Sequence, residues 1–194
     1  MKKYGILVLA IAFITMSFVK PIQQKEGVLK VDVTNSTVNW KGYKPTGSHN
    51  GTINLASGEL QFEEGAIKGG SFTVEMSSIK DASGSGRLEG HLKSGDFFDV
   101  KTFTTSKFEI TGIENTEGKV AITGDMTIKG ITKQLTFFVS VTETEESVTL
   151  ISETFHINRA DFNVKYKSKS FFNNLKEKFI NDEFDLQVVI VAAK

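Results

Sequence analysis

The sequence contains no cysteine and only two prolines among its 194 residues. Without cysteine the chain can form no disulfide and has no thiolate chemistry, so the hydrophobic core alone must stabilise the fold. The scarcity of proline beside seventeen glycines is typical of ordered strands that are joined by tight turns.

A long hydrophobic run is also missing, except at the N-terminus. There two lysines precede an apolar stretch of sixteen residues, residues 4–19. This layout is typical of a secretory signal peptide, and the stretch is shorter than the roughly 20 residues that a membrane-spanning helix needs. We therefore predict that residues 1–22 are a signal peptide with a poorly marked cleavage site, that residues 23–194 form one domain, and that the protein is periplasmic or secreted. A retained membrane anchor is the alternative.

An excess of positive charge is absent. The chain has 23 basic and 23 acidic residues, and loss of the three lysines in residues 1–22 would leave a net charge near −3. Such a domain lacks the electrostatic footprint of a nucleic-acid-binding protein, so no nucleic-acid partner is predicted.

Arginine is rare, since the chain has only Arg87 and Arg159 beside 21 lysines. A residue used so sparingly is expected to serve through its rigid fork of donors rather than through charge alone. For Arg159 two interpretations stay open. It pairs with Asp161 or another carboxylate, or it contacts a polar or anionic headgroup at the mouth of a pocket.

Catalytic motifs are missing as well. There is no Gly-x-Ser-x-Gly stretch, and the glycines of residues 84–90 miss the spacing and the βα unit of a dinucleotide-binding loop. The three histidines, His49, His91 and His156, stand apart without metal-binding spacing. No catalytic residue, metal or cofactor is predicted.

What the sequence does contain is alternation of apolar and polar residues. A period of two over such lengths indicates half-buried β-strands, and glycine-bearing turns separate them. Strands at this spacing predict a meander that either stacks as a sandwich or closes into a barrel, and closure removes exposed edges. The alternating apolar positions include Phe72, Val74, Met76, Val120, Ile122, Met126, Ile128, Leu135, Phe137, Val139, Val141, Ile151, Phe155, Ile157, Phe184, Leu186, Val188 and Ile190.

Two segments, residues 84–100 and 168–179, break the strand pattern, and each carries a Phe-Phe pair. Their apolar residues recur at helical spacing, so each is predicted to be a short amphipathic helix lying on an apolar surface. Within the first segment, we expect Asp96 to cap the helix rather than to form an acid–base pair with Asp99.

Phenylalanine is abundant, with sixteen residues against three tyrosines and one tryptophan. These rings can simply fill a small barrel, or they can line the apolar cavity of a wider one, and the pattern alone does not choose. The residues predicted to line such a cavity are Trp40, Phe72, Val74, Met76, Phe97, Phe98, Phe108, Ile110, Ile122, Met126, Ile128, Phe137, Val139 and Phe155.

Four segments taken together resemble the YceI-like family in order and spacing. They are HLKSGDFFDV at residues 91–100, KTFTTSKFEI at 101–110, ITGDMTIKGITKQLTFFV at 122–139 and FHINRADFNV at 155–164. The resemblance extends from about Val31 to the C-terminus.

This resemblance implies an all-β fold, an extended, eight-stranded antiparallel lipocalin-like barrel, with one or two short helices covering an end. It also implies a secreted or periplasmic protein that holds a long apolar chain and has no catalytic residues. The sequence departs from the family at Thr104, where a proline is usual, and at Asn163, where a glycine is usual. His49 and Arg159 are the residues predicted to contact a headgroup at the mouth.

The leading hypothesis is a non-enzymatic carrier of a long-chain lipid, such as a polyisoprenoid, an isoprenoid quinone or a fatty-acid derivative. Transient contact with a membrane is expected, and a homodimer is left open. One alternative is an enzyme whose titratable groups, His49, His91, Asp96 and Arg159, converge inside the cavity. Another is a filled barrel with a structural or partner-binding role.

Overall fold

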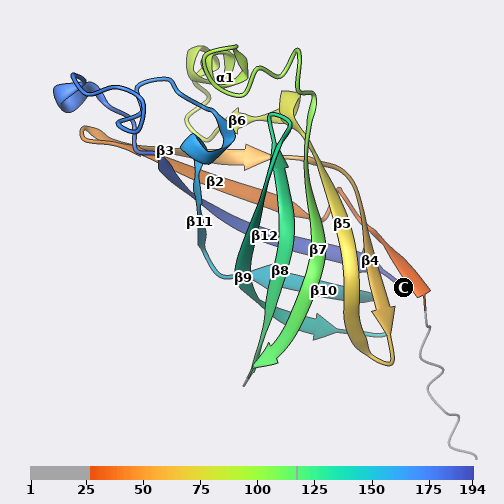
Figure 1. Ribbon diagram of the computed structural model, residues 1–194. Helices are drawn as coiled ribbons and strands as arrows, with labels where there is room; N and C mark the ends of the chain where they lie inside the picture. The colour runs from red at the N-terminus through yellow and green to blue at the C-terminus, as the bar shows by residue number, and fades with distance from the viewer. Residues whose placement is uncertain (1–26, 117) are drawn as a thin grey trace, which may run out of the picture.

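The computed structural model describes residues 27–116 and 118–194, so the predicted signal peptide lies outside the described residues. Most of these residues form β-strands, and α1 (Gly86–Lys93) is the one α-helix among them (Figure 1). Three 3₁₀ turns are η1 (Met76–Ser78), η2 (Arg159–Phe162) and η3 (Lys176–Lys178). The strands are β1 (Gly27–Val31), β2 (Thr37–Lys44), β3 (Gly47–Ile53), β4 (Leu55–Glu63), β5 (Ala66–Glu75), β6 (Lys80–Asp81), β7 (Thr105–Thr116), β8 (Lys119–Ile128), β9 (Ile131–Glu143), β10 (Ser147–Ser152), β11 (Phe155–Asn158) and β12 (Glu183–Ala193).

Eight long strands, each of which is called a line here, close into one antiparallel barrel. Four of these lines are interrupted and consist of two consecutive strands each: β1 and β2, β3 and β4, β5 and β6, and β10 and β11. Each line pairs with the next, and β12 closes the barrel by pairing with β10 and β11 along one edge and with β1 and β2 along the other. The prediction of an all-β, eight-stranded, lipocalin-like antiparallel barrel is confirmed.

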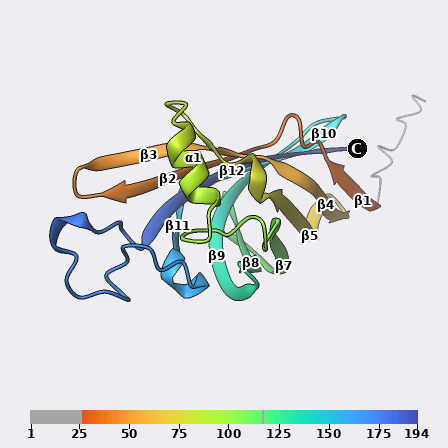
Figure 2. The ribbon, with the colours of Figure 1, turned by 90° about the horizontal axis from the view of Figure 1, so that it is seen from above.

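The two ends of the barrel differ in what lies inside them. The C-terminus lies at one end of the barrel (Figure 1). At this end apolar side chains of different sizes pack together and fill the interior. At the other end α1 lies across the barrel (Figure 2), and the β2–β3 hairpin extends past the rim (Figure 1). The side chains of the filled end are buried, and they include Leu29, Leu60, Phe62, Ile67, Ile110, Val148 and Ala192.

Gly124 interrupts the apolar alternation of β8 because the Phe108 ring of the neighbouring strand covers this position. A Cβ atom at Gly124 would lie 2.4 Å from Cζ of Phe108 and 2.5 Å from the carbonyl oxygen of Glu109. A position with no side chain therefore leaves the space that the Phe108 ring occupies over the backbone of β8.

The first predicted helical segment contains α1. Its N-cap is Ser85, whose Oγ accepts a hydrogen bond from the backbone N–H of Leu88 at 3.3 Å. The prediction that Asp96 caps this helix is wrong, because α1 ends before Asp96, which instead lies 3.4 Å from Nε2 of His91.

The predicted helix over residues 168–179 is also wrong. The chain there forms turns and only the three-residue η3, and Lys167 and Lys176 have positive φ angles of 49° and 48° that a right-handed helix does not accommodate. The apolar residues at helical spacing have no common surface to cover, since Phe171 and Phe172 are exposed. Without such a surface a short helix is not stable.

Asn163 ends η2 in the left-handed conformation, with φ of 59°. Asparagine adopts this conformation more readily than most residues other than glycine. The family-typical glycine and the asparagine found here therefore meet the same backbone requirement, and the departure at this position leaves the turn intact.

Replacing Gly124 with alanine is expected to lower the free energy of unfolding by about 1–3 kcal/mol, because the new Cβ would collide with the Phe108 ring and the Glu109 carbonyl. Gly112→Ala is the matched control on the same strand pair, since its Cβ would meet only Cβ of Thr123 at 3.6 Å. Urea unfolding of both variants measures the difference. An equal loss of stability in the two variants would contradict the account of Gly124.

Candidate functional site

An apolar cavity of about 230 Å³ occupies the end of the barrel below α1. Alternate residues of the barrel strands form its wall, and α1 contributes Leu88 and Leu92. Along β12 the wall runs from Phe184 to Ile190, a distance of about 20 Å at the usual rise of a strand. Beyond Ile190 the interior is filled, so the cavity is closed at its inner end.

The side chains predicted to line the interior border this cavity, with one exception. Ile110 is buried in the filled end and is not part of the cavity wall. It alternates in step with Phe108, so the sequence pattern assigned it to the correct face of β7 but could not show how deep the cavity extends. Contact between the lining residues and a lipid stays a prediction.

The sequence-based prediction missed about as many lining residues as it found. The alternation of β12 placed its even-numbered apolar residues on one face, but they were not included among the predicted lining residues, and most faces of β2 to β4 were not assigned. The missed apolar residues are Val38, Ile53, Leu55, Ile79, Leu88, Leu92, Leu150, Ile180, Phe184, Leu186, Val188 and Ile190.

Three phenylalanine rings stack along one side of the cavity. The ring centroids of Phe108 and Phe137 are 5.3 Å apart, and those of Phe137 and Phe155 are 4.3 Å apart with the planes inclined by only 9°. Offset and tilted packing of this kind fixes aromatic rings in place. The three rings form one part of the apolar wall of the cavity.

Phe97 and Phe98 attach the segment after α1 to the end of the barrel. Phe97 is buried, its ring centroid is 5.5 Å from that of Tyr166, and the guanidinium carbon of Arg159 lies 5.7 Å from its centroid. Phe98 packs against the main core, and both rings border the cavity. The Phe-Phe pair thus forms part of the cover of the cavity.

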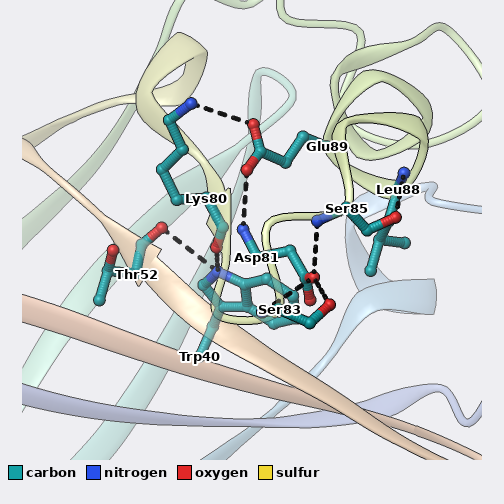
Figure 3. Close-up of polar contacts among 8 residues, drawn as sticks. All are labelled: Trp40, Thr52, Lys80, Asp81, Ser83, Ser85, Leu88 and Glu89. Atoms are coloured by element: carbon teal, nitrogen blue, oxygen red, sulfur yellow. Dashed lines mark hydrogen bonds and ion pairs between the residues drawn. The ribbon is translucent and has the colours of Figure 1, made fainter.

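A polar network holds β6 and α1 beside the mouth (Figure 3). Nε1 of Trp40 donates hydrogen bonds to the carbonyl oxygens of Thr52 and Lys80 at 3.3 and 3.2 Å, which satisfies the one polar atom of this wall residue. Glu89 of α1 accepts a hydrogen bond from the backbone N–H of Asp81 at 3.2 Å and pairs with Nζ of Lys80 at 3.1 Å. The helix is therefore tied to the rim strand.

Asp81 organises the turn that leads into α1. Its buried carboxylate accepts hydrogen bonds from the hydroxyl of Ser83 and from the backbone N–H groups of Ser83 and Ser85, the latter two at 3.2 Å. The Ser83 hydroxyl is the main cause that lowers the pKa of Asp81 below its ordinary value of 3.8. His49, which borders the cavity, places Nδ1 3.6 Å from the same carboxylate.

Arg159 borders the cavity, but the donors of its guanidinium group bind backbone carbonyl oxygens of the protein. Nε and both terminal nitrogens donate hydrogen bonds of 2.9 Å to the carbonyl oxygens of Asn181, Val164 and Ile180. Its carboxylate partner is Asp182 at 3.2 Å. Of the two interpretations of Arg159, the geometry favours pairing with a carboxylate other than Asp161, and contact with a headgroup stays a prediction.

The titratable groups of the enzymatic alternative do not converge. His49 and Arg159 border the cavity, whereas His91 and Asp96 pair with each other outside its wall. Within residues 27–116 and 118–194, no group of three histidine, aspartate or glutamate side chains is placed to hold a metal ion. The same part of the chain contains no helix with the length and apolar character needed to cross a membrane.

Comparison with known proteins places this architecture in a family. The family model of the YceI-like domain matches residues 29–192. The chain belongs to the YceI-like family. A UPF0312 protein of Vibrio campbellii is 31% identical over 87 residues, which cover 44% of this chain and 46% of the relative. A UPF0312 protein of Pseudomonas putida is 31% identical over 88 residues, 45% of this chain and 46% of the relative. The chain thus spans about half the length of the curated relatives that it matches.

Solved structures share the fold at lower identity. BcnA of Burkholderia cenocepacia is 21% identical with a TM-score of 0.70, covering 84% of this chain and 99% of BcnA. A polyisoprenoid-binding domain of Saccharophagus degradans, implicated in plant cell wall breakdown, is 12% identical with a TM-score of 0.60, covering 84% and 97%. The YceI protein of Campylobacter jejuni is 16% identical with a TM-score of 0.56, covering 100% and 99%. At these identities the likeness concerns the fold alone.

The lowered pKa of Asp81 predicts a specific dependence of stability on pH. Because the folded carboxyl group binds its proton less readily than the unfolded one, its hydrogen bonds stabilise the fold above a pH near 3.8 and are lost as the pH falls through and below that value. The Asp81→Asn variant should therefore melt at a lower Tm than the wild type at about pH 6, and its Tm should fall less between about pH 6 and about pH 3.

Thermal melts of the two proteins across this pH range check the prediction. Glu145→Gln, in the exposed turn at the opposite end of the barrel, is the control and should follow the wild-type curve. Parallel curves for Asp81→Asn and the wild type would contradict the role assigned to Asp81.

Proposed function

We propose that this protein binds the apolar tail of a lipid in the cavity below α1 and carries or sequesters that lipid outside the cytoplasm, without chemical conversion. The observation that carries the proposal is the cavity itself. Its wall is made almost wholly of apolar side chains, and it lies in a barrel whose opposite end is tightly filled. Membership in a family with a polyisoprenoid-binding structural neighbour supports the same conclusion.

An empty apolar cavity of this size lowers the free energy of unfolding of a protein. At about 24 cal/mol for each Å³, a void of 230 Å³ destabilises the fold by on the order of 5 kcal/mol. That is comparable to the lower end of the total stability of a domain, about 5–15 kcal/mol. Water gives little relief, because apolar cavities offer it too few hydrogen-bonding partners. A hydrocarbon chain in the cavity would remove this cost, and so its binding would be favourable.

The dimensions of the cavity favour one tail rather than a bulky ligand. Its volume lies below the roughly 300–1,000 Å³ that is common for small-molecule pockets, while its wall is about 20 Å long. A polyisoprenoid, the side chain of an isoprenoid quinone and a fatty-acid derivative all have an apolar tail of this kind. Because apolar burial is not directional, the cavity would select by length and girth more than by chemical group.

The mouth supplies the polar contacts of the proposed complex. His49 and Lys44 border the cavity from the β2–β3 hairpin, and the side chain of His49 is partly exposed. Nδ1 of His49 lies 3.6 Å from the carboxylate of Asp81, which holds the imidazole at the rim of the cavity. We assign contact with a polar or anionic headgroup to His49 and Lys44, with Arg159 holding the rim in shape.

The proposed location outside the cytoplasm is supported by the N-terminal sequence. A basic start and an apolar stretch over residues 4–19 are typical of a segment that directs export. The absence of cysteine makes the fold independent of the redox state of the compartment. In an aqueous space outside the cytoplasm, a lipid needs a carrier because its tail is nearly insoluble in water.

Val188→Phe is expected to weaken lipid binding by about tenfold or more, because the added ring would occupy the middle of the cavity wall on β12. Fluorescence titration with parinaric acid, a fatty acid that fluoresces in an apolar environment, measures the affinity. The Tm of the variant should be unchanged or higher, since the ring fills a void.

Val189→Phe is the matched control for this experiment. Val189 is the next residue of the same strand, it is not part of the cavity wall, and it pairs with Thr37 and Ile151. Its replacement should leave the affinity for parinaric acid intact. Equal affinities for the wild type and a normally folded Val188→Phe variant would contradict lipid binding in the cavity.

A further inference from the structure

One loop at the open end of the barrel exposes large apolar side chains. This loop, residues 165–180, lies at the same end of the molecule as α1 (Figures 1 and 2). Phe171 and Phe172 are 42% and 48% exposed, which is unusual for two adjacent phenylalanines in a water-soluble domain. We refer to residues 165–180 as the mouth loop.

The mouth loop presents these rings because its backbone is held in a defined shape. The carbonyl oxygen of the buried Ser168 accepts hydrogen bonds from the backbone N–H groups of Phe171 and Phe172 at 3.2 and 3.0 Å. Ser170 donates from its hydroxyl to Oδ2 of Asp182 at 2.8 Å, and Asp182 in turn pairs with Arg159. The exposure of the two rings is therefore a property of the folded loop.

The charge of the mouth loop differs from that of the rest of the chain. It contains five lysines and a single acidic residue, Glu177, in a protein whose total charge is balanced. Nζ of Lys165 lies 5.3 Å from the ring centroid of Phe171, so positive charge stands directly beside the exposed rings. Phenylalanine together with lysine is the composition of surfaces that lie in a membrane interface, where rings enter the acyl boundary and lysines contact anionic headgroups.

The mouth loop also adjoins the cavity. Ile180, its last residue, and the following Asn181 border the cavity, and their carbonyl oxygens accept hydrogen bonds from Arg159. A membrane that contacts Phe171 and Phe172 would consequently lie close to the mouth. A lipid tail could then pass between bilayer and barrel over a short path.

We propose that the mouth loop docks on an anionic membrane surface, with Phe171 and Phe172 inserted at the headgroup boundary and the lysines against acidic headgroups. The inference rests on the proposed function, because docking serves to transfer the lipid between the bilayer and the cavity. The partner is identified as an anionic membrane because the positive charge of the five lysines complements acidic lipid headgroups. Docking of this kind is reversible, since two rings bury too little apolar area for permanent insertion.

The absence of cysteine allows the loop to be tested directly in the full chain. Asn173→Cys introduces a single thiol in the exposed part of the mouth loop, and an environment-sensitive dye attached there reports local insertion. Glu145→Cys places the same dye in an exposed turn at the opposite end of the barrel. Residues 1–26 are identical in both labelled proteins, so any contribution from them is common to both.

Vesicles of phosphatidylcholine with one quarter phosphatidylglycerol are expected to shift the emission of the Asn173 probe to the blue and to leave the Glu145 probe unchanged. Partition into these vesicles should fall with rising salt and in vesicles of phosphatidylcholine alone.

Phe171→Ser with Phe172→Ser should remove the shift. Each lysine changed to glutamine should reduce partition roughly fivefold. Phe138→Ser, at a phenylalanine of β9 that is 41% exposed, is the matched control and should leave the shift intact.

Three results would overturn the inference: no shift at Asn173, an equal shift at Glu145, or a shift that survives the loss of both loop phenylalanines. Titration with parinaric acid without vesicles tests the cavity separately. If the cavity binds the fatty acid and the Asn173 probe does not respond, docking is wrong and the proposed function stands. If the probe responds and the cavity does not bind, the proposed function and the transfer role of the loop both fail.

Discussion

The structure depends on one constraint, the closure of a sheet whose inner face carries apolar side chains that fill only part of the enclosed space. Most of the strands alternate, so closure brings their apolar side chains together on the inner face. β12 makes closure possible because it is long enough to pair with two strands on each edge. Because the inner side chains are mostly apolar, water finds few hydrogen-bonding partners inside the barrel. The space that side chains do not fill therefore stays available to another apolar molecule.

The two ends of the barrel are stabilised by different interactions. The filled end, with Leu60, Phe62 and Val148 fully or almost fully buried, provides close packing that compensates for a cavity elsewhere. The open end is kept in shape by polar contacts at its rim, where Asp81 fixes the turn into α1 and Arg159 fixes the turn before β12. Both groups are satisfied by the protein itself. These hydrogen bonds hold the rim in a fixed shape, although no packed core lies directly beneath it.

The sequence predicted the strands because a period of two is a local property that survives folding. The pattern left a sandwich and a barrel open, and the prediction of a barrel came from the resemblance to the YceI-like family. It also assigned residues such as Phe72, Phe137 and Val139 to a common face, and the structure places them on the cavity wall. The depth of the cavity was not predictable, since whether Ile110 meets a void or another side chain depends on how closely distant strands approach.

The errors have equally physical causes. Helical spacing of apolar residues in the mouth loop suggested a helix, but a helix forms only where its apolar face is covered, and here Phe171 and Phe172 are exposed. Arg159 finds Asp182 and the Asn181 carbonyl more than twenty residues away, and no local pattern encodes that distance. The N-cap of α1 proved to be Ser85, eleven residues before the aspartate expected to cap it.

The most direct test of the central claim is to identify what the barrel contains when cells produce it. Protein isolated under mild conditions would be extracted with organic solvent, and the extract would be analysed and quantified by mass spectrometry. The account predicts one tail-bearing apolar lipid for each chain, recovered in near-stoichiometric amount. An extract without such a lipid, from protein that also fails to take one up when it is supplied, would contradict the account.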